Sequence, residues 1–287
     1  MDTDTKSSQV VSQRKDPLGE RLAELPWWVV AIIFIGIAAT TTIINQENYR
    51  QAFDFILIGI RVTIETTLWS YSFALMIGLI AGLGRISKNV VFRNLATLYV
   101  ELIRGVPILV LIFFIALVLV PSVVDSIQAY GLGLTEKGFP LIGEFLGQID
   151  NSAFSMNVRA IIALSVTYGA FMAEIFRAGI QSIGRGQMEA ARSLGMSYGQ
   201  SMRYIILPQA IRNVLPALGN DFIAMVKDSS LVSVLAVRDI TQVARLYAGR
   251  TFRFREAYTV LATLYLSMTL VLSFFVRLIE KRYNTND

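Results

Sequence analysis

The chain has 287 residues, of which 54% are hydrophobic and only 16% are charged, and its mean hydropathy is +0.55. Soluble domains carry about a quarter charged residues, so this composition predicts a membrane protein. Cysteine and histidine are both absent, which excludes disulfides and thiolate metal sites and removes the usual metal ligand and general base. The net charge of +5 is better explained by membrane orientation than by nucleic-acid binding.

The amino-terminal region is polar, and no small-residue cleavage site follows its first apolar run. Residues 1–25 are therefore predicted to form a cytoplasmic tail rather than a removable signal peptide. Trp27 and Trp28 stand where an aromatic belt would anchor a first membrane span, which extends to about Ile44.

A short turn at 45–54 leads to a second span within about 56–84. Arg61 and Glu65 stand four residues apart there, a spacing that allows an ion pair on one helix face. The basic residues that follow indicate a return to the cytoplasmic side; they are Arg85, Lys88 and Arg93.

A third span is predicted at about 95–121, beginning with LYVELIRGVPILVLIFF. Glu101 and Arg104 are spaced for an ion pair within this helix. Ionisable residues so close to an apolar run usually face a bundle interior, which makes both candidates for a solute path. An interfacial anchor pair is the alternative interpretation. Pro107 is expected to loosen the helix backbone.

Residues 122–155 contain one lysine and no arginine, and are predicted to form an exposed external loop. A fourth span follows at about 157–180, and Glu174 near its inner end is a further path candidate. The last span is predicted at about 257–279.

One polar stretch, 189–208, has internal order of its own. Ala190 and Ala191 begin a helical run after Glu189, and Leu194 completes a small apolar face with them. Gly195 suits a helix stop, because glycine adopts the left-handed backbone conformation without a Cβ penalty.

A second helix is expected to begin late in this stretch, since proline favours the first turn of a helix. The residues that mark it are Ile205, Leu207 and Pro208. A helix, a turn and a helix form a knob that fits a groove in a partner. An amphipathic loop lying on the bilayer is the alternative.

The fifth segment, about 207–235, is too polar to face lipid, so it is expected to line a cavity or to reach only partway across. Lys227 and Asp228 are both candidates for the solute path; the alternative is that they pair with each other and only fix the helix. The polar path candidates in this segment are Asp221, Lys227, Asp228, Ser229 and Ser230.

The order E-A-A, three residues, G, nine residues, I, one residue, L-P over 189–208 matches the EAA signature of permease subunits of binding-protein-dependent ABC importers. In that family the signature forms a coupling helix that docks onto the ATP-hydrolysing subunit. The sequence E-L-I-R-G-x-P at 101–107 also resembles the branch of that family that imports polar amino acids.

The resemblance covers about 60–280 and implies an all-α integral membrane protein similar to ABC type I importers, with about six transmembrane helices. It places a cytoplasmic coupling loop at 182–208 inside a permease domain at 26–283. It also implies a bacterial plasma membrane location, with both termini cytoplasmic.

The resemblance further implies a transport subunit rather than an enzyme. No phosphate-loop sequence occurs in the chain, so ATP and Mg are expected on a separate subunit and no cofactor on this chain. The implied partners are two ATPase subunits, a second copy or a paralogous permease, a substrate-binding protein and membrane lipid, with no nucleic acid.

Five arginines before the last span would be external, against the positive-inside rule. They are candidates for contact with the acidic rim of a binding protein: Arg238, Arg245, Arg250, Arg253 and Arg255.

Three alternatives remain open. An ion-gradient-coupled secondary transporter would explain the broken fifth segment but not the ordered stretch at 189–208. An enzyme using carboxylates is disfavoured by the absence of histidine, cysteine and a clustered carboxylate pair. An exporter is disfavoured by the resemblance to importers.

Overall fold

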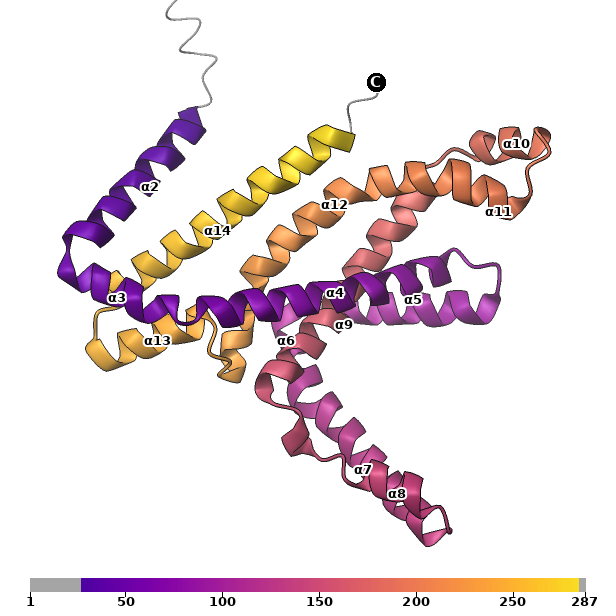
Figure 1. The fold of residues 1–287 in the computed structure, drawn as a ribbon, viewed down its shortest axis with the longest axis horizontal. Coiled ribbons are helices and arrows are strands. Elements are labelled where there is room, and N and C mark those ends of the chain that lie inside the picture. The colour runs from indigo at the N-terminus through magenta and orange to yellow at the C-terminus, as the bar shows by residue number, and fades with distance from the viewer. Residues whose placement is uncertain (1–26, 284–287) are drawn as a thin grey trace, which may run out of the picture.

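The computed structural model describes residues 27–283, and over this range the chain forms helices and no strand. The predicted cytoplasmic tail lies outside the described residues. In chain order, the elements (Figure 1) are α2 (Trp27–Asn45), α3 (Glu47–Leu57), α4 (Ile60–Arg85), α5 (Val90–Arg104), α6 (Ile108–Phe114), the π-helical turn η1 (Ile115–Leu119), α7 (Val120–Glu136), α8 (Pro140–Gly147), the 3-10 turn η2 (Asn151–Ala153), α9 (Met156–Gln181), α10 (Arg185–Ser193), α11 (Tyr198–Ser201), the π-helical turn η3 (Met202–Ile206), α12 (Leu207–Asp228), the 3-10 turn η4 (Ser229–Leu235), α13 (Ile240–Thr251) and α14 (Phe254–Tyr283).

Four helical stretches of the described chain are long and apolar enough to cross a membrane. They are Glu47–Arg85, Ile108–Glu136, Met156–Gln181 and Phe254–Arg282, and Val30–Asn45 is a shorter apolar helix. The predicted fifth span, α12, is not among them, since charged and polar residues recur along it. Length and composition therefore support a multi-pass membrane protein without fixing the count at six.

The centre of the bundle is the contact between α4 and α9, which lie close together because glycines face the neighbouring helix. A Cβ atom on Gly78 would lie 2.6 Å from the Cβ of Met172, and one on Gly82 would lie 2.8 Å from the carbonyl oxygen of Ala173. Small residues of this kind let transmembrane helices approach closely. The buried side chains around this contact come from α4, α6, α9 and α12.

A second buried cluster joins α2, α3, α13 and α14, with Ile56, Ile240 and Val260 fully buried. The predicted turn at 45–54 is therefore wrong. This stretch belongs to the amphipathic helix α3, which buries Tyr49, Ala52 and Ile56. The acidic and basic residues of the stretch lie on the outer face of that helix, which explains why it resembled a polar turn.

The third span also differs from the prediction. The stretch 95–121 is not one helix, because α5 ends at Arg104 and the chain bends at Gly105–Pro107 before α6 begins. Proline cannot continue the backbone hydrogen bonding of a helix interior, and the residue before it avoids helical geometry. The α6, η1 and α7 segments then form a continuous helical stretch to Glu136.

The predicted external loop at 122–155 is mostly helical. It contains most of α7, all of α8 and the short turn η2. Asp150 caps η2, and hydrogen bonds from the side chain and backbone of Ser152 hold the pKa of the Asp150 carboxyl below its ordinary value.

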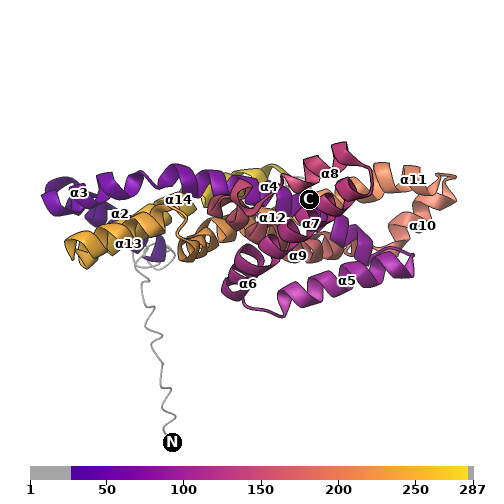
Figure 2. The ribbon, with the colours of Figure 1, turned by 90° about the horizontal axis from the view of Figure 1, so that it is seen from below.

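The elements separate into two ends of the molecule. In Figure 1, α10, α11, the start of α2 and the end of α14 lie toward the upper side, whereas α3 and α13 lie at the left. The view from below in Figure 2 shows the helices spread within a thin layer. The α7–α8 hairpin projects away from the other helices at the lower right of Figure 1.

Candidate functional site

The stretch that matches the EAA signature forms a short helix that stops where the sequence predicts. The helix α10 runs from Arg185 to Ser193 and includes Glu189, Ala190 and Ala191. Gly195 has φ +81°, and the amide of the following Met196 donates to the carbonyl oxygen of Ala191 at 3.2 Å. This left-handed glycine satisfies the last helical carbonyl groups.

The second helix begins earlier than predicted. Ser197 caps α11 by accepting from the amide of Gln200, whose side chain in turn accepts from the amide of Ser197. This reciprocal capping box starts the helix at Tyr198 rather than at Pro208. The sequence contains the signal, a serine followed three residues later by glutamine.

Pro208 lies within the helical run that leads from α11 through η3 into α12. It has no N–H to donate, and the π-helical turn η3 directly precedes α12, in which Pro208 is an early residue. Ile205 lies in η3, and Leu207 is the first residue of α12. The loop thus joins the end of α9 to the start of α12 through the short helix α10, a turn at 194–197 and a continuous helical run that begins with α11.

The outer surface of this loop carries apolar and charged side chains together. Ala191 is buried, while Glu189 and Ala190 are exposed and Leu194 is 83% exposed. Exposed apolar side chains that gather on one loop are candidates for contact with a partner. The other large exposed apolar side chains of the loop are Tyr198, Tyr204 and Leu207.

A cluster of charged residues joins three helices next to this loop. Arg85 at the end of α4 pairs with Glu174 of α9 at 2.8 Å and with Glu101 of α5 at 3.1 Å. Glu174 also pairs with Arg177 one turn later. Arg85 is largely buried, and a partly buried guanidinium with two carboxylate partners fixes the helices relative to one another.

The predicted ion pair between Glu101 and Arg104 is not found among the described residues. Glu101 turns to Arg85, and the Arg104 guanidinium lies 5.9 Å from the ring centroid of Phe171. Glu101 and Arg104 are spaced for a pair on one helix, but each contacts a residue of a neighbouring helix instead, Arg85 of α4 and Phe171 of α9. By contrast, the predicted pair of Arg61 and Glu65 is confirmed at 2.7 Å.

The second group of predicted path residues lies along α12 and in η4. Asp228 accepts a hydrogen bond from the Tyr168 hydroxyl at 2.7 Å. The Oδ2 atom of Asp221 is buried and has no hydrogen-bond partner among the described residues. Ser229 is buried and donates to the carbonyl oxygen of Val226, and Ser230 is half-buried.

Lys227 is exposed, and within the described residues it forms no ion pair with Asp228. The predicted structural pair is therefore wrong, because adjacent residues on a helix point about 100° apart.

Two tyrosines that the sequence did not single out complete this interior group. Tyr71 of α4 donates to the carbonyl oxygen of Leu218 at 2.9 Å and packs edge-on against Phe222. Tyr168 of α9 reaches Asp228. Their positions within apolar spans were the available signal, because a buried tyrosine hydroxyl usually needs a polar partner.

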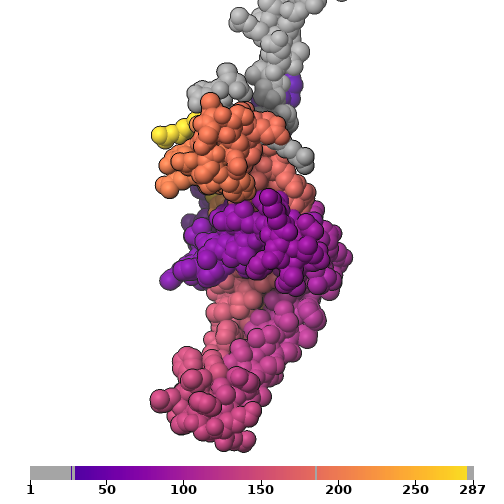
Figure 3. All heavy atoms as spheres, turned by 90° about the vertical axis from the view of Figure 1, so that its right-hand side faces the viewer, coloured from indigo at the N-terminus to yellow at the C-terminus, as the bar shows by residue number. Residues whose placement is uncertain are grey.

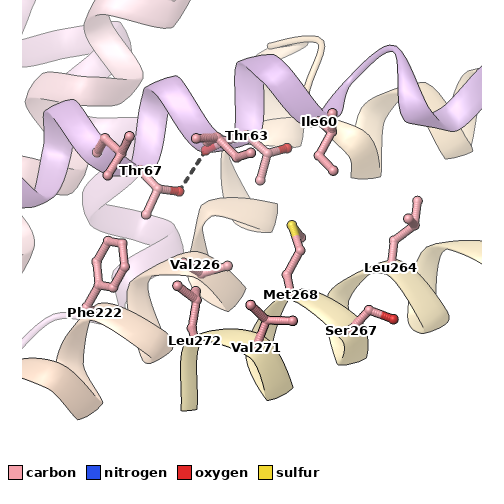
Figure 4. A pocket seen from close by; sticks show the side chains of 12 residues that line it. Ile60, Thr63, Thr67, Phe222, Val226, Leu264, Ser267, Met268, Val271 and Leu272 are labelled. Atoms are coloured by element: carbon pink, nitrogen blue, oxygen red, sulfur yellow. Dashed lines mark hydrogen bonds between the residues drawn. The ribbon is translucent and has the colours of Figure 1, made fainter. Parts of the chain in front are cut away.

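Two pockets flank α12. One of about 500 Å³ lies between α4, α12 and α14, with Thr63 and Thr67 on one side and Met268 and Val271 on the other (Figure 4). It is lined almost wholly by apolar atoms, and none of the predicted path residues lines it. The other, of about 620 Å³, lies between α9 and α12 beside the loop and includes Glu174, Arg212 and Asn213.

The five arginines before the last span lie around α13, at the end of the molecule away from α10 and α11 (Figure 1). Arg253 donates to the side chain of Gln51 in α3 at 2.9 Å. Arg238, Arg245, Arg250 and Arg255 are exposed.

Comparison with known proteins agrees with these features. The family model described as "Binding-protein-dependent transport system inner membrane component" matches residues 74–285. The chain is 35% identical over 241 residues to the probable amino-acid ABC transporter permease protein YckA of Bacillus subtilis (strain 168), covering 84% of this chain and 94% of the relative. It is 32% identical over 231 residues to the glutamine transport system permease protein GlnP of Escherichia coli (strain K12), covering 80% and 94%.

Solved structures show the same fold. A crystal structure described as an amino acid ABC transporter with histidines aligns with a TM-score of 0.65 at 35% identity, covering 80% of this chain and 94% of that chain. The MetNI methionine ABC transporter in an inward-facing conformation aligns with a TM-score of 0.59 at 18% identity, covering 80% and 96%. The family match extends over most of the sequence, and the chain therefore belongs to the inner membrane components of binding-protein-dependent transport systems, which are multi-pass transport subunits rather than enzymes.

Proposed function

We propose that the chain is the permease subunit of an ATP-driven importer for a polar amino acid. The observation that carries this proposal is the loop at 182–208, a helical knob with an exposed apolar tip that joins α9 to α12. The amino-acid and glutamine permeases to which the chain is similar suggest the substrate class.

The complex is expected to contain two ATPase subunits that carry ATP and Mg, and a second copy of this chain or a paralogous permease. A substrate-binding protein delivers the solute. A cyclic twofold arrangement is the commonest symmetry for such a pair.

The loop acts as a lever in this proposal. A hydrogen bond of 2.9 Å from the Asn213 side chain of α12 to the Ser182 hydroxyl joins the two ends of the loop. The two ends are therefore expected to move together. Glu174 of α9 is joined to α4 and α5 through Arg85. When the ATPase subunits close, a displacement of α10 therefore passes to α9 and α12 and, through Arg85, to two further helices. Only a difference in binding between the two conformations can shift their populations.

The two acidic residues of α12, Asp221 and Asp228, are candidates for contact with the solute. An amino acid carries an ammonium group that needs an acceptor, and the buried Asp221 oxygen has none within the described part of the chain. Asp228 lies on the same helix and is oriented by Tyr168. We assign these two carboxylates to the ammonium group, with Ser229 and Ser230 beside them.

The remaining path candidates fall into other roles in this proposal. Glu101, Arg104 and Glu174 lie in or beside the charged cluster next to the loop, where they hold the helices. Lys227 is exposed and is available to the solute carboxylate.

Both termini and the loop are placed in the cytoplasm, and α13 on the outer side. The exposed arginines around α13 then face the binding protein. Reversing two of these charges, at Arg245 and Arg250, should weaken its docking; unchanged docking would remove this part of the proposal.

The coupling role is tested in the purified complex with its ATPase and binding protein, reconstituted in lipid vesicles. Glu189→Lys reverses the charge on the exposed face of α10, and Gly195→Glu places a side chain at φ +81°, where only glycine is unstrained. Both variants should insert into the membrane but lose amino acid uptake and substrate-stimulated ATP hydrolysis. Glu136→Lys, an exposed charge reversal in α7, is the matched control and should retain both activities.

Normal uptake by either coupling variant would refute the assignment. Assaying the wild-type complex against each amino acid identifies the substrate. Accumulation of solute on an ion gradient without any ATPase subunit would overturn the proposed function as a whole.

A further inference from the structure

The two helices of the α7–α8 hairpin are packed so closely that they form one unit. A Cβ atom on Gly131 would lie 2.5 Å from the backbone nitrogen of Gly147, and Gly143 packs directly against Thr135. The turn between the helices contains Gly138 at φ +88°. Close packing through glycines leaves the larger side chains of both helices on the outside.

These outer faces are strongly apolar. Leu141 and Phe145 are 86% and 70% exposed, and because they stand four residues apart they share one face of α8. On α7, Val123 and Tyr130 are exposed and also share a face. Leu132, Phe139 and Ile142 are exposed as well.

The apolar surface continues into a membrane span. The α7 helix is the second half of Ile108–Glu136, which has the highest mean hydropathy of the four candidate spans. Its 29 residues reach roughly 43 Å as a helix, more than the roughly 30 Å of hydrocarbon they would need to cross. The helix is therefore long enough for part of it to lie along the membrane.

The direction of the hairpin agrees with the second possibility. In Figure 1, α7 and α8 lead away from the bundle and run across the direction of α12 and α14. Figure 3 shows this segment as a separate protrusion at the lower end of the molecule. Since α14 belongs to a candidate span, a hairpin that runs across its direction lies along the membrane rather than through it.

We propose that the α7–α8 hairpin lies in the membrane leaflet opposite the coupling loop, with the face that contains Leu141 and Phe145 against lipid acyl chains. A helix in this position buries its apolar face about 5–10 Å into the boundary between headgroups and chains. The exposed charged side chains Asp125 and Glu136 lie, by helical spacing, on the side of α7 away from Val123 and Tyr130, and this side remains in contact with water.

The charges of the hairpin indicate which part of the lipid holds it. Residues 120–147 contain three acidic residues, Asp125, Glu136 and Glu144, and one basic residue, Lys137. This balance opposes attraction to anionic headgroups, which needs clustered basic residues. Burial of apolar surface is thus the source of the attraction, and it should not depend on salt.

The absence of cysteine from the chain allows a direct test with single spin labels in the intact complex, in nanodiscs of phosphatidylethanolamine and phosphatidylglycerol. Spin labels are attached to the single-cysteine variants Leu141→Cys and Phe145→Cys, and Glu136→Cys is the control on the charged, water-facing side of α7. Ile80→Cys, on an exposed position of α4, is the lipid-facing control. The measurement is the accessibility of each label to oxygen, which concentrates in lipid, relative to a water-soluble nickel chelate.

Labels at 141 and 145 are expected to resemble the label at 80, with an oxygen-to-nickel ratio several-fold above that at 136, unchanged in high salt. Equal nickel access at 141, 145 and 136 would identify an aqueous loop and overturn the proposal. Shielding that occurs only when binding protein is added, or dipolar broadening between copies, would identify a protein partner and overturn it as well. None of these outcomes depends on uptake, so they are separate from the test of the proposed function.

Discussion

At the scale of single residues, glycines decide how closely the helices approach. Gly78 and Gly82 lie where α4 meets α9, and Gly195 ends α10 with a positive φ. Arg85 has a comparable role for charge, because one side chain joins the carboxylates of two other helices. A substitution at any of these positions is expected to affect the packing of more than one helix.

The α4–α9 contact leads to a prediction on stability. Gly78→Ala adds a Cβ atom that would lie 2.6 Å from the Cβ of Met172 and 3.1 Å from the carbonyl oxygen of Gly169. Overpacking of a dense interior costs about 1–3 kcal/mol, so the variant should unfold at a lower apparent Tm in detergent. Gly36→Ala in α2 is the matched control, because no atom lies within 4 Å of its added Cβ, and its Tm should not fall. Equal Tm values for wild type and Gly78→Ala would mean that α4 and α9 are less tightly packed than described.

At the scale of elements, local capping signals set the shape of the coupling loop. The loop has a glycine stop at Gly195 and a capping box of Ser197 and Gln200, and together they make two helices at a defined turn. From α11 the chain continues as one helical run through η3 into α12. The hydrogen bonds that define this turn are local, from the backbone at Gly195 and from the side chains of Ser197 and Gln200.

The capping box makes a second prediction. Ser197→Ala removes the acceptor for the amide of Gln200, which costs about 1 kcal/mol of local helix stability. Amides of 198–206 should then exchange with solvent about fivefold faster, as expected for local opening. Ser193→Ala, an exposed serine at the end of α10, should leave this exchange unchanged. If both variants exchange alike, the second helix is held by packing and not by its cap.

At the scale of the whole molecule, the helices place the coupling loop and the arginines of α13 at opposite ends (Figure 1). If the loop is cytoplasmic, as proposed, this separation puts the arginines outside, against a positive-inside rule that is weaker for late segments than for the first ones. Family membership also removes the support for an ion-gradient-coupled transporter.

Orientation is the third prediction. In the cysteine-free chain, Arg250→Cys on α13 should react with a membrane-impermeant maleimide added to intact cells. Ser87→Cys, between α4 and α5, should react only after the membrane is permeabilised. The reverse labelling pattern would place the coupling loop outside and contradict the assigned orientation.

The sequence by itself determined the features that depend on neighbouring residues and on composition. Apolar runs identified the membrane protein, Gly195 identified the end of α10, and the spacing of Arg61 and Glu65 identified their ion pair. The ordered stretch at 189–208 led to the family that the comparisons establish. Each of these signals lies within one helix or one turn, where geometry follows from the local chain.

The tertiary structure decided what depends on contacts between distant segments. Glu101 forms an ion pair with Arg85 rather than with Arg104, and Asp228 accepts a hydrogen bond from Tyr168 rather than pairing with Lys227. In both cases the partner lies on a neighbouring helix. The segments at 45–54 and 122–155 became helices because their glycine and apolar faces pack against other helices. A polar or glycine-rich segment resembles a loop in sequence, and only the surface it meets in the folded chain makes it a helix.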